Sequence, residues 1–175
     1  MLLAQNIDRL KESMDVPKPV AEIMAVEVLP RIFVGDSRAA NSSSFFKQAQ
    51  ISGVLNMTAS IPNKFRCDDK IEYLRVPVYD CKMKRDVNQM RQYFLLVTEF
   101  IHKITVLEQR NILVHCALGR QRSCAAVAAY LIRYHDMAPL EAMRFIVARK
   151  PDAFHWGKSA NFGPALNMWY TDRSE

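Results

Sequence analysis

The sequence predicts one α/β domain, in which the strands of a sheet are layered against helices. Two observations support this fold class. Short apolar segments typical of strands alternate along the chain with longer amphipathic segments typical of helices. In addition, 175 residues, of which 50% are hydrophobic, suit a single core better than two. We expect an N-terminal helix and linker over residues 1–25, followed by a single domain over residues 26–175.

The beginning of the chain is predicted to hold a helix and then a strand. A helix is expected over residues 4–14, before a proline-containing joint at Val16–Pro19, and the pattern leaves open whether it packs on the domain, binds a partner or frays. Glu27–Val34 is typical of a strand, and Pro30 restricts it to a sheet edge or to a bend between two short strands. Gly35–Asp36 ends this segment.

The next part of the chain alternates between helix, strand and loop. Ser42 or Ser43 can cap a short helix. A buried strand is predicted at Gly53–Met57 and a second strand at Ile71–Val76, and a polar loop at Val78–Asp86 follows them.

A long helix is predicted after that loop because apolar residues recur there every three or four positions, namely at Val87, Met90, Phe94, Val97, Ile101 and Ile104. Asn111–His115 is typical of a short buried strand, and Arg122–Tyr134 is rich in residues that favour helices. Pro139 opens a further helix that runs to Arg149. A last helix is expected from Ser159 to Tyr170.

The charge of the chain favours anionic ligands. Lys and Arg number 24 against 18 Asp and Glu, which gives a formal net charge of +6. Such a balance is compatible with phosphate groups, nucleic acid or a membrane surface, and does not choose among them.

The cysteines and apolar segments predict a reducing compartment, the cytoplasm or the nucleus. The four cysteines lack the paired spacing of a disulfide framework or of a zinc site. Charges at Asp8 and Arg9 interrupt any signal-peptide core, and the longest apolar run, Cys124–Ile132, is too short to cross a bilayer. We therefore expect no membrane span.

The segment from His115 to Ser123 carries the chemistry. A predicted strand ends at Cys116, a turn containing Gly119 follows, and a predicted helix opens at Arg122. A loop at a helix N-terminus directs backbone N–H groups and positive potential toward one point, which suits an anion. There the Cys116 thiol would lose its proton more readily than a free thiol, whose pKa is about 8.5. Arg122 could hold two oxygens of a phosphoryl group.

This segment, HCALGRQRS, resembles the HCx5RS signature of the cysteine-dependent protein phosphatases, and most closely that of their dual-specificity group. The resemblance also covers the LPRIFVGD stretch, Val54–Asn56, Tyr73–Asp80 and Ala129–Leu131. It implies a mixed, mostly parallel sheet and catalysis through a phosphocysteine. Under this resemblance Cys116 is the nucleophile, and the phosphate is bound by the loop residues Ala117, Leu118, Gly119, Arg120, Gln121 and Arg122.

A general acid is also required, because the leaving oxygen must receive a proton. Asp80 lies in the loop position where the family carries its acid, and would return as the base for the attacking water. Asp86 is the rival carboxylate, although it can equally cap the long helix. The resemblance further implies that Ser123 helps the sulfur to leave, and we expect His115 to brace the loop rather than to transfer protons.

Two loop residues depart from the family's usual pattern. Gln121 stands where many relatives have a small residue, and it could face away or shape the pocket. Arg120 adds a cation that could be a solvated rim charge or could bind substrate. Further basic residues lie in or after the acid loop: Lys82, Lys84, Arg85 and Arg91.

The leading hypothesis is a monomeric dual-specificity phosphatase that needs no metal or cofactor and acts on phosphorylated proteins. One alternative keeps the mechanism but has a phosphoinositide, another polyphosphate or an RNA 5′ phosphate as its substrate. In either case we do not expect the protein to bind nucleic acid as a structural partner. A second alternative is a non-catalytic module that binds phosphoproteins. Cys81 or Cys124 could have a redox role, in which its thiol forms a disulfide with oxidised Cys116. The alternative for Cys124 is simple burial as a small apolar residue.

Overall fold

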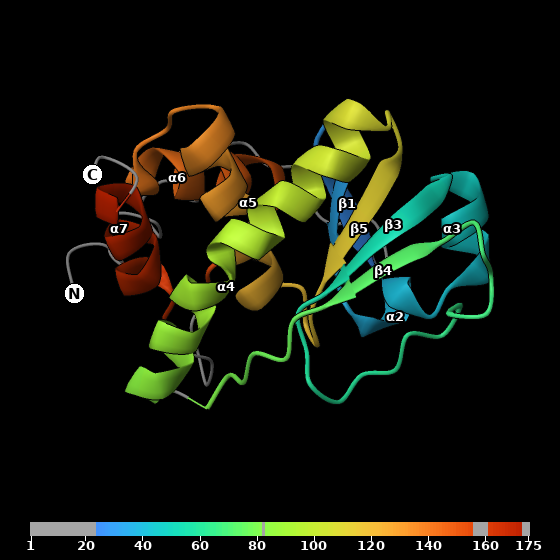
Figure 1. Ribbon diagram of the computed structural model, residues 1–175, viewed down its shortest axis with the longest axis horizontal. Coiled ribbons are helices and arrows are strands. Elements are labelled where there is room, and N and C mark those ends of the chain that lie inside the picture. Colours follow the sequence, from blue (N-terminus) through green and yellow to red (C-terminus); the bar gives the residue numbers. More distant parts are fainter. Residues whose placement is uncertain (1–23, 82, 156–160, 173–175) are drawn as a thin grey trace.

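A computed structural model describes residues 24–81, 83–155 and 161–172 of the chain. A five-stranded sheet lies at its centre, with helices on both faces (Figure 1). The strand order is β1-β2-β5-β3-β4, so strands distant in the sequence are neighbours in space. The predicted fold class, an α/β domain with a mixed and mostly parallel sheet, is confirmed. The prediction for the N-terminal helix falls outside the described residues.

The strands set where the connecting loops meet. β1 (Ala25–Leu29) runs antiparallel to β2 (Ile32–Gly35), while β5 (Asn111–His115), β3 (Ile51–Asn56) and β4 (Glu72–Arg75) continue the sheet in parallel. His115 is in register with Gly35 on one side and with Asn56 on the other. The loops that leave β2, β5 and β3 therefore start side by side at one edge of the sheet, where α/β proteins commonly place their sites.

The helices form two layers of unequal size. α2 (Ser37–Ala40) and α3 (Ser43–Gln48) cover one face of the sheet, whereas α4 (Lys84–His102), α5 (Arg122–Tyr134), α6 (Pro139–Arg149) and α7 (Gly163–Asp172) cover the other (Figure 1). A short π-helical segment, η1 (Lys103–Leu107), ends α4. Among the described residues, no helix has the length and apolar character needed to span a bilayer.

Each face of the sheet has its own core, because successive side chains of a strand point to opposite sides. Val54 and Leu113 pack in the small core under α2 and α3. Their neighbours Leu55 and Val114 pack in the large core under the other helices. The apolar strands are thus buried on both faces, as expected for parallel strands.

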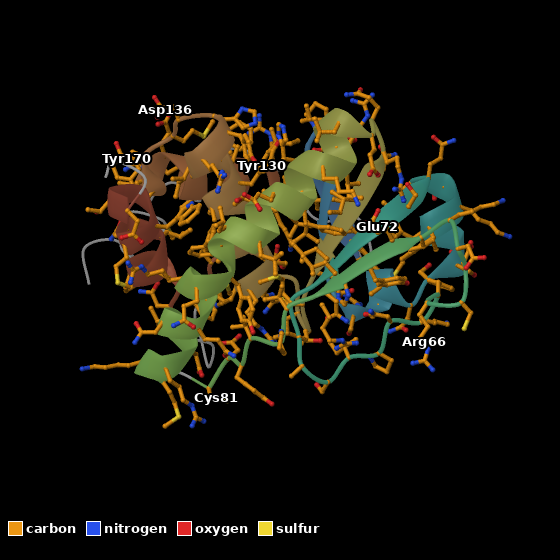
Figure 2. All side chains as sticks on the ribbon, viewed as in Figure 1. Arg66, Glu72, Cys81, Tyr130, Asp136 and Tyr170 are labelled. Carbon is orange, nitrogen blue, oxygen red and sulfur yellow. The ribbon has the colours of Figure 1, made fainter. Side chains whose placement is uncertain are left out.

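Charged side chains protect the β4 edge of the sheet. Glu72, labelled in Figure 2, accepts from Lys103 at 2.6 Å and lies 3.4 Å from Arg110. Such exposed pairs add little stability each. Charges at an edge strand nevertheless discourage pairing with strands of other molecules.

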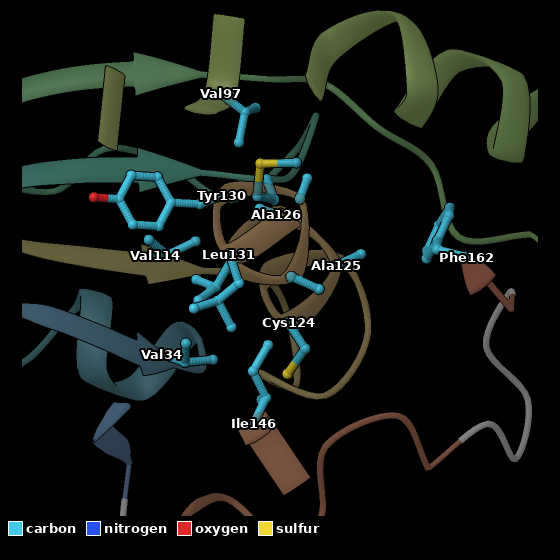
Figure 3. Close-up of a cluster of buried hydrophobic side chains, with 14 of the residues drawn as sticks. Val34, Val97, Val114, Cys124, Ala125, Ala126, Tyr130, Leu131, Ile146 and Phe162 are labelled. Atoms are coloured by element: carbon cyan, nitrogen blue, oxygen red, sulfur yellow. The ribbon is translucent and has the colours of Figure 1, made fainter. Parts of the chain in front are cut away.

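α5 is the central helix of the large core. Every residue from Ser123 to Ile132 is buried, which is typical of a helix that is enclosed on all sides. Four alanines between these ends allow neighbouring elements to approach closely. Figure 3 shows α5 surrounded by side chains of the sheet, of α4 and of α6, including Val114, Val97 and Ile146.

Most predicted elements match the structure. The bounds predicted for β5, α5 and α6 coincide with the observed ones, and Ser42 caps α3 by accepting from the Phe45 N–H at 3.2 Å. The segment around Pro30 forms two short strands joined by a turn, which is the second of the two options. The last helix spans Gly163–Asp172, and residues 159–160 of the predicted segment lie outside the described ones.

Several elements differ from the predictions. β3 spans Ile51–Asn56 instead of Gly53–Met57, and β4 spans Glu72–Arg75 instead of Ile71–Val76. Asp36 does not simply end a strand, because its carboxylate accepts from the backbone N–H groups of Arg38 and Ala39 and starts α2. α4 begins at Lys84, three residues earlier than expected. Its first turn carries no apolar stripe, so periodicity could not locate it.

The cap at Asp36 provides a test of the fold. Asp36→Ala removes the acceptor for two N–H groups, and we expect it to lower the free energy of unfolding by about 1–2 kcal/mol. Asp36→Asn keeps an acceptor oxygen and should cost clearly less. Urea unfolding monitored by circular dichroism measures both, and equal losses in the two variants would contradict the capping role.

Candidate active site

Four chain segments converge on Cys116 at the edge of the sheet. Cys116 follows β5 directly, Met57 follows β3, and the segment after β2 supports the loop from beneath. The chain after β4 passes the same point at Val78, whose carbonyl is bound by Arg122. The topology therefore brings together the predicted nucleophile, arginine and acid loop.

The loop from Cys116 to Gln121 has a tightly constrained path. Gly119 has a φ of +69°, in the left-handed region, and a Cβ placed there would lie 2.7 Å from the carbonyl oxygen of Gly35. The Ser37 N–H donates to the Ala117 carbonyl at 3.2 Å, and the Phe154 N–H donates to the Arg120 carbonyl at 2.7 Å. The loop is thus fixed from both sides.

Cys116 is 2% exposed and is surrounded by hydrogen-bond donors. Its Sγ accepts from the Gly119 N–H at 3.2 Å and lies 3.5 Å from the Ser123 hydroxyl. Burial alone would raise the pKa of the Cys116 thiol. The Arg122 charge and the hydrogen bonds from Ser123 and Gly119 outweigh burial and hold that pKa below its ordinary value. The sulfur is therefore prepared to act as a thiolate nucleophile.

Arg122 is held so that one edge of its guanidinium remains available. Its Nη1 donates to the carbonyl oxygens of Val78 at 3.0 Å and of Met57 at 3.4 Å. Its Nε is buried and has no hydrogen-bond acceptor among the residues that the structure describes, and Asp80 Oδ2 is 3.7 Å away. That edge has the fork geometry that binds two oxygens of a phosphoryl group.

The two candidate carboxylates occupy different environments. Asp80 faces Arg122 in a partly buried ion pair, beside the cysteine loop. Asp86 is buried in the first turn of α4, where its Oδ2 accepts from the N–H groups of Cys81 at 2.8 Å and Met83 at 3.3 Å. Asp86 thus holds the end of the acid loop to the helix, and only Asp80 lies against the arginine.

His115 is buried beneath the loop, at the end of β5. Burial is the main cause that lowers its pKa to about 4, and the Arg75 and Arg122 charges contribute in the same direction. A hydrogen bond with the Cys116 backbone and the Asp36 charge oppose the shift. His115 is consequently neutral at physiological pH. Its Nδ1 has no hydrogen-bond partner among the described residues, so the expected role of a brace for the loop stays a prediction.

The remaining loop residues divide into exposed and buried positions. Leu118 is 62% exposed at the rim. Arg120 pairs with Asp152 at 3.2 Å, and Asp152 is shared with Lys150. Gln121 does not face solvent: it is 2% exposed, and neither polar atom of its side chain has a hydrogen-bond partner among the described residues.

Several supporting residues were missed by the sequence analysis. Asn56 donates to the Ile61 carbonyl at 2.9 Å, and Arg75 donates to the Thr58 carbonyl at 2.9 Å. Together they fix the loop after β3, and with it the Met57 carbonyl that holds Arg122. A buried asparagine at a strand end and an arginine in a strand were the available signals.

All four cysteines of the chain are unpaired in the structure. Cys124 is buried below the loop, and its thiol donates to the Gly119 carbonyl at 3.4 Å. Burial raises the pKa of this thiol strongly, which keeps it protonated. Cys81 and Cys67 are exposed. The redox role considered for Cys81 or Cys124 stays a prediction.

Comparison with known families agrees with this geometry. Residues 32–172 match the family described as "Dual specificity phosphatase, catalytic domain", and the chain belongs to that family. The resemblance noted in the sequence is thereby confirmed.

Individual relatives show the same relationship. The chain is similar to dual specificity protein phosphatase 18 of Rattus norvegicus, with 32% identity over 71% of this chain and 58% of the relative. The chain therefore spans less than two thirds of that protein's length.

Solved structures of this fold are also similar to the chain. The crystal structure of human DUSP28 has a TM-score of 0.70 and 23% identity, covering 91% of this chain and 100% of that one. The crystal structure of DUSP15 has a TM-score of 0.72 and 23% identity, covering 86% and 90%. At this level of identity the likeness establishes the fold.

The environment of Cys116 predicts its reactivity. We expect iodoacetate to alkylate Cys116 with a pH midpoint below the value of about 8.5 for a free thiol such as that of glutathione. Ser123→Ala should move the midpoint upward, because it removes a hydrogen bond to the sulfur. Mass spectrometry of the peptide containing Cys116 measures the rate, and a midpoint equal to that of glutathione would contradict the prediction.

The low pKa of His115 predicts how stability depends on pH. The unfolded chain binds a proton at this histidine below about pH 6.5, whereas the folded chain does so only near pH 4. The unfolded state then holds more protons, so stability should fall by about 3 kcal/mol between pH 6.5 and pH 4.

Urea unfolding at several pH values measures this loss. His115→Asn should show a smaller decline over the same range, because asparagine does not titrate. Identical pH profiles for the two proteins would show that His115 does not cause the loss.

Proposed function

We propose that this chain is a phosphatase that hydrolyses phosphotyrosine, and also phosphoserine and phosphothreonine, in proteins. The observation that carries the proposal is the arrangement at Cys116: a buried sulfur with a lowered pKa, ringed by donors, with Arg122 and Asp80 beside it. Family membership supports the same conclusion.

In the first step the Cys116 thiolate attacks phosphorus and forms an S–P bond while the P–O bond to the substrate breaks. Asp80 gives its proton to the departing oxygen, so that the product leaves as a neutral alcohol or phenol. The Nε edge of Arg122, which has no hydrogen-bond acceptor among the described residues and faces Asp80 at 3.7 Å, binds the equatorial oxygens together with the N–H groups of the loop as their charge develops.

In the second step a water attacks the phosphocysteine. The Asp80 carboxylate takes a proton from that water, the S–P bond breaks, and inorganic phosphate is released. The returning thiolate is stabilised by the Ser123 hydroxyl, 3.5 Å from the sulfur, and by the Gly119 N–H. The acid and the nucleophile are thereby restored.

A phosphoinositide or an RNA 5′ phosphate remains the second candidate class of substrate. The excess of basic charge around the site is the observation that suggests this class of substrate. Arg120 shares the single carboxylate of Asp152 with Lys150, so one positive charge of that cluster is not compensated. Lys84 and Arg85 add to it at the start of α4. Lys82 lies outside the described residues. We infer that a phosphorylated protein is the better substrate, and that the chain works as a monomer in the cytoplasm or nucleus.

Turnover of para-nitrophenyl phosphate in the presence of EDTA tests the mechanism. Cys116→Ser should lower kcat by at least about a thousandfold, because the hydroxyl is a far weaker nucleophile. Asp80→Asn should lower it by about a hundredfold or more, since the leaving group then departs without a proton.

Cys67→Ser serves as the matched control, because it makes the same change at an exposed cysteine. Its kcat should equal that of the unmodified chain. Undiminished turnover in Cys116→Ser would refute the phosphocysteine mechanism. Binding of phosphopeptides without any turnover would instead favour the non-catalytic module.

A further inference from the structure

A groove lies directly beside the acid loop. It has a volume of about 680 Å³ and is lined by Tyr79 and by the first turns of α4, namely Arg85, Asp86, Asn88, Gln89 and Gln92. Tyr79 stands between Val78, whose carbonyl binds Arg122, and Asp80, which pairs with Arg122. Its side chain is 55% exposed and lines the groove, so the groove adjoins the acid loop along the chain.

The helical wall of the groove is one continuous stripe. Arg85, Asn88, Gln89 and Gln92 are spaced at i, i+3, i+4 and i+7, so they lie on one face of α4. The opposite face, with Met90 and Phe94, is buried in the core. From position 85 to position 92 the helix rises about 10 Å, which is the length of about three residues of extended peptide.

The polar groups of this stripe suit a peptide main chain. Three of its side chains are carboxamides, each with a donor and an acceptor, which matches the alternating C=O and N–H groups of an extended segment. A polyanionic lipid headgroup would instead favour a cluster of cations. Farther along α4, Leu95 and Leu96 are 48% and 46% exposed and offer apolar contact beyond the stripe.

The charge of the groove favours an acidic residue. Arg85 is 74% exposed at its mouth, next to Lys84. Among the lining residues that the structure describes, Asp86 is the only carboxylate. It is 1% exposed and engaged with the N–H groups of Cys81 and Met83, 3.8 Å from Arg85. Asp172 is paired with Arg91 at 2.8 Å. The exposed charge of the lining is therefore positive.

We propose that this groove binds the segment of a phosphoprotein that flanks the phosphorylated residue, and that Arg85 selects an acidic side chain in that segment. Asn88, Gln89 and Gln92 hold its main chain, and Tyr79 lies between the flanking residues and the phosphorylated one. The inference rests on the proposed function and specifies its substrate class, a phosphopeptide with acidic residues beside the phosphate.

Two phosphotyrosine peptides that differ only in their flanking residues, acidic in one and lysine in the other, test this proposal. Arg85→Glu should lower kcat/KM for the acidic peptide about fivefold by raising KM, and should raise kcat/KM for the lysine peptide. It should leave kcat/KM for para-nitrophenyl phosphate unchanged, because that substrate does not reach the groove. The double variant Gln89→Ala, Gln92→Ala should lower kcat/KM for both peptides by the same factor.

Arg66→Glu is the matched control. It changes the charge by the same amount at an exposed arginine, and Figure 2 shows Arg66 on the sheet side of the molecule, away from Cys81 and the start of α4. A general electrostatic effect would move both variants alike, whereas the groove predicts an effect for Arg85→Glu alone.

Binding to the Cys116→Ser chain gives a readout that does not require turnover. Fluorescence anisotropy should show that Arg85→Glu in this background weakens the acidic peptide about fivefold. Equal affinity with and without Arg85→Glu, or an effect confined to vesicles containing phosphoinositides, would overturn the groove proposal. Absence of para-nitrophenyl phosphate turnover in the unmodified chain would instead overturn the proposed function, and the binding result would still decide the role of the groove.

Discussion

The hydrogen bonding of the Arg122 guanidinium to two backbone carbonyl oxygens is the interaction on which the rest of the site depends. Its Nη1 joins the Met57 carbonyl after β3 to the Val78 carbonyl after β4, while the residue itself opens α5 next to the cysteine loop. One guanidinium thus fixes three loops, lowers the pKa of Cys116 and keeps an edge available for an anion. Without this cation, burial would favour the neutral thiol.

Much of the fold could be predicted because its signals are local. β5 is a short apolar run, α5 follows a glycine-containing turn, and α6 opens at Pro139, so neighbouring residues define their bounds. α2 was missed because it is only four residues long and depends on a single cap at Asp36. The start of α4 was misplaced because Asp86 stabilises it from inside the first turn, and not from the position before it.

The site was predictable to the extent that its residues lie in one loop. Cys116, Gly119, Arg122 and Ser123 are brought together by a short segment, and the resemblance supplied Asp80. The supporting contacts join residues far apart in the sequence, as when Asp152 pairs with Arg120 or Arg75 binds the loop after β3. No local pattern encodes such pairs, and only the folded sheet reveals them.

The buried side chain of Gln121 lowers the stability of the folded chain at the end of the cysteine loop. Among the described residues its amide has no partner, and a buried polar group in that condition is unfavourable by about 1–3 kcal/mol. A smaller residue at this position would remove the unpaired amide but would leave a cavity, whose cost opposes that gain. The stability of this end of the cysteine loop is therefore set by two opposing costs, that of an unpaired buried amide and that of a void.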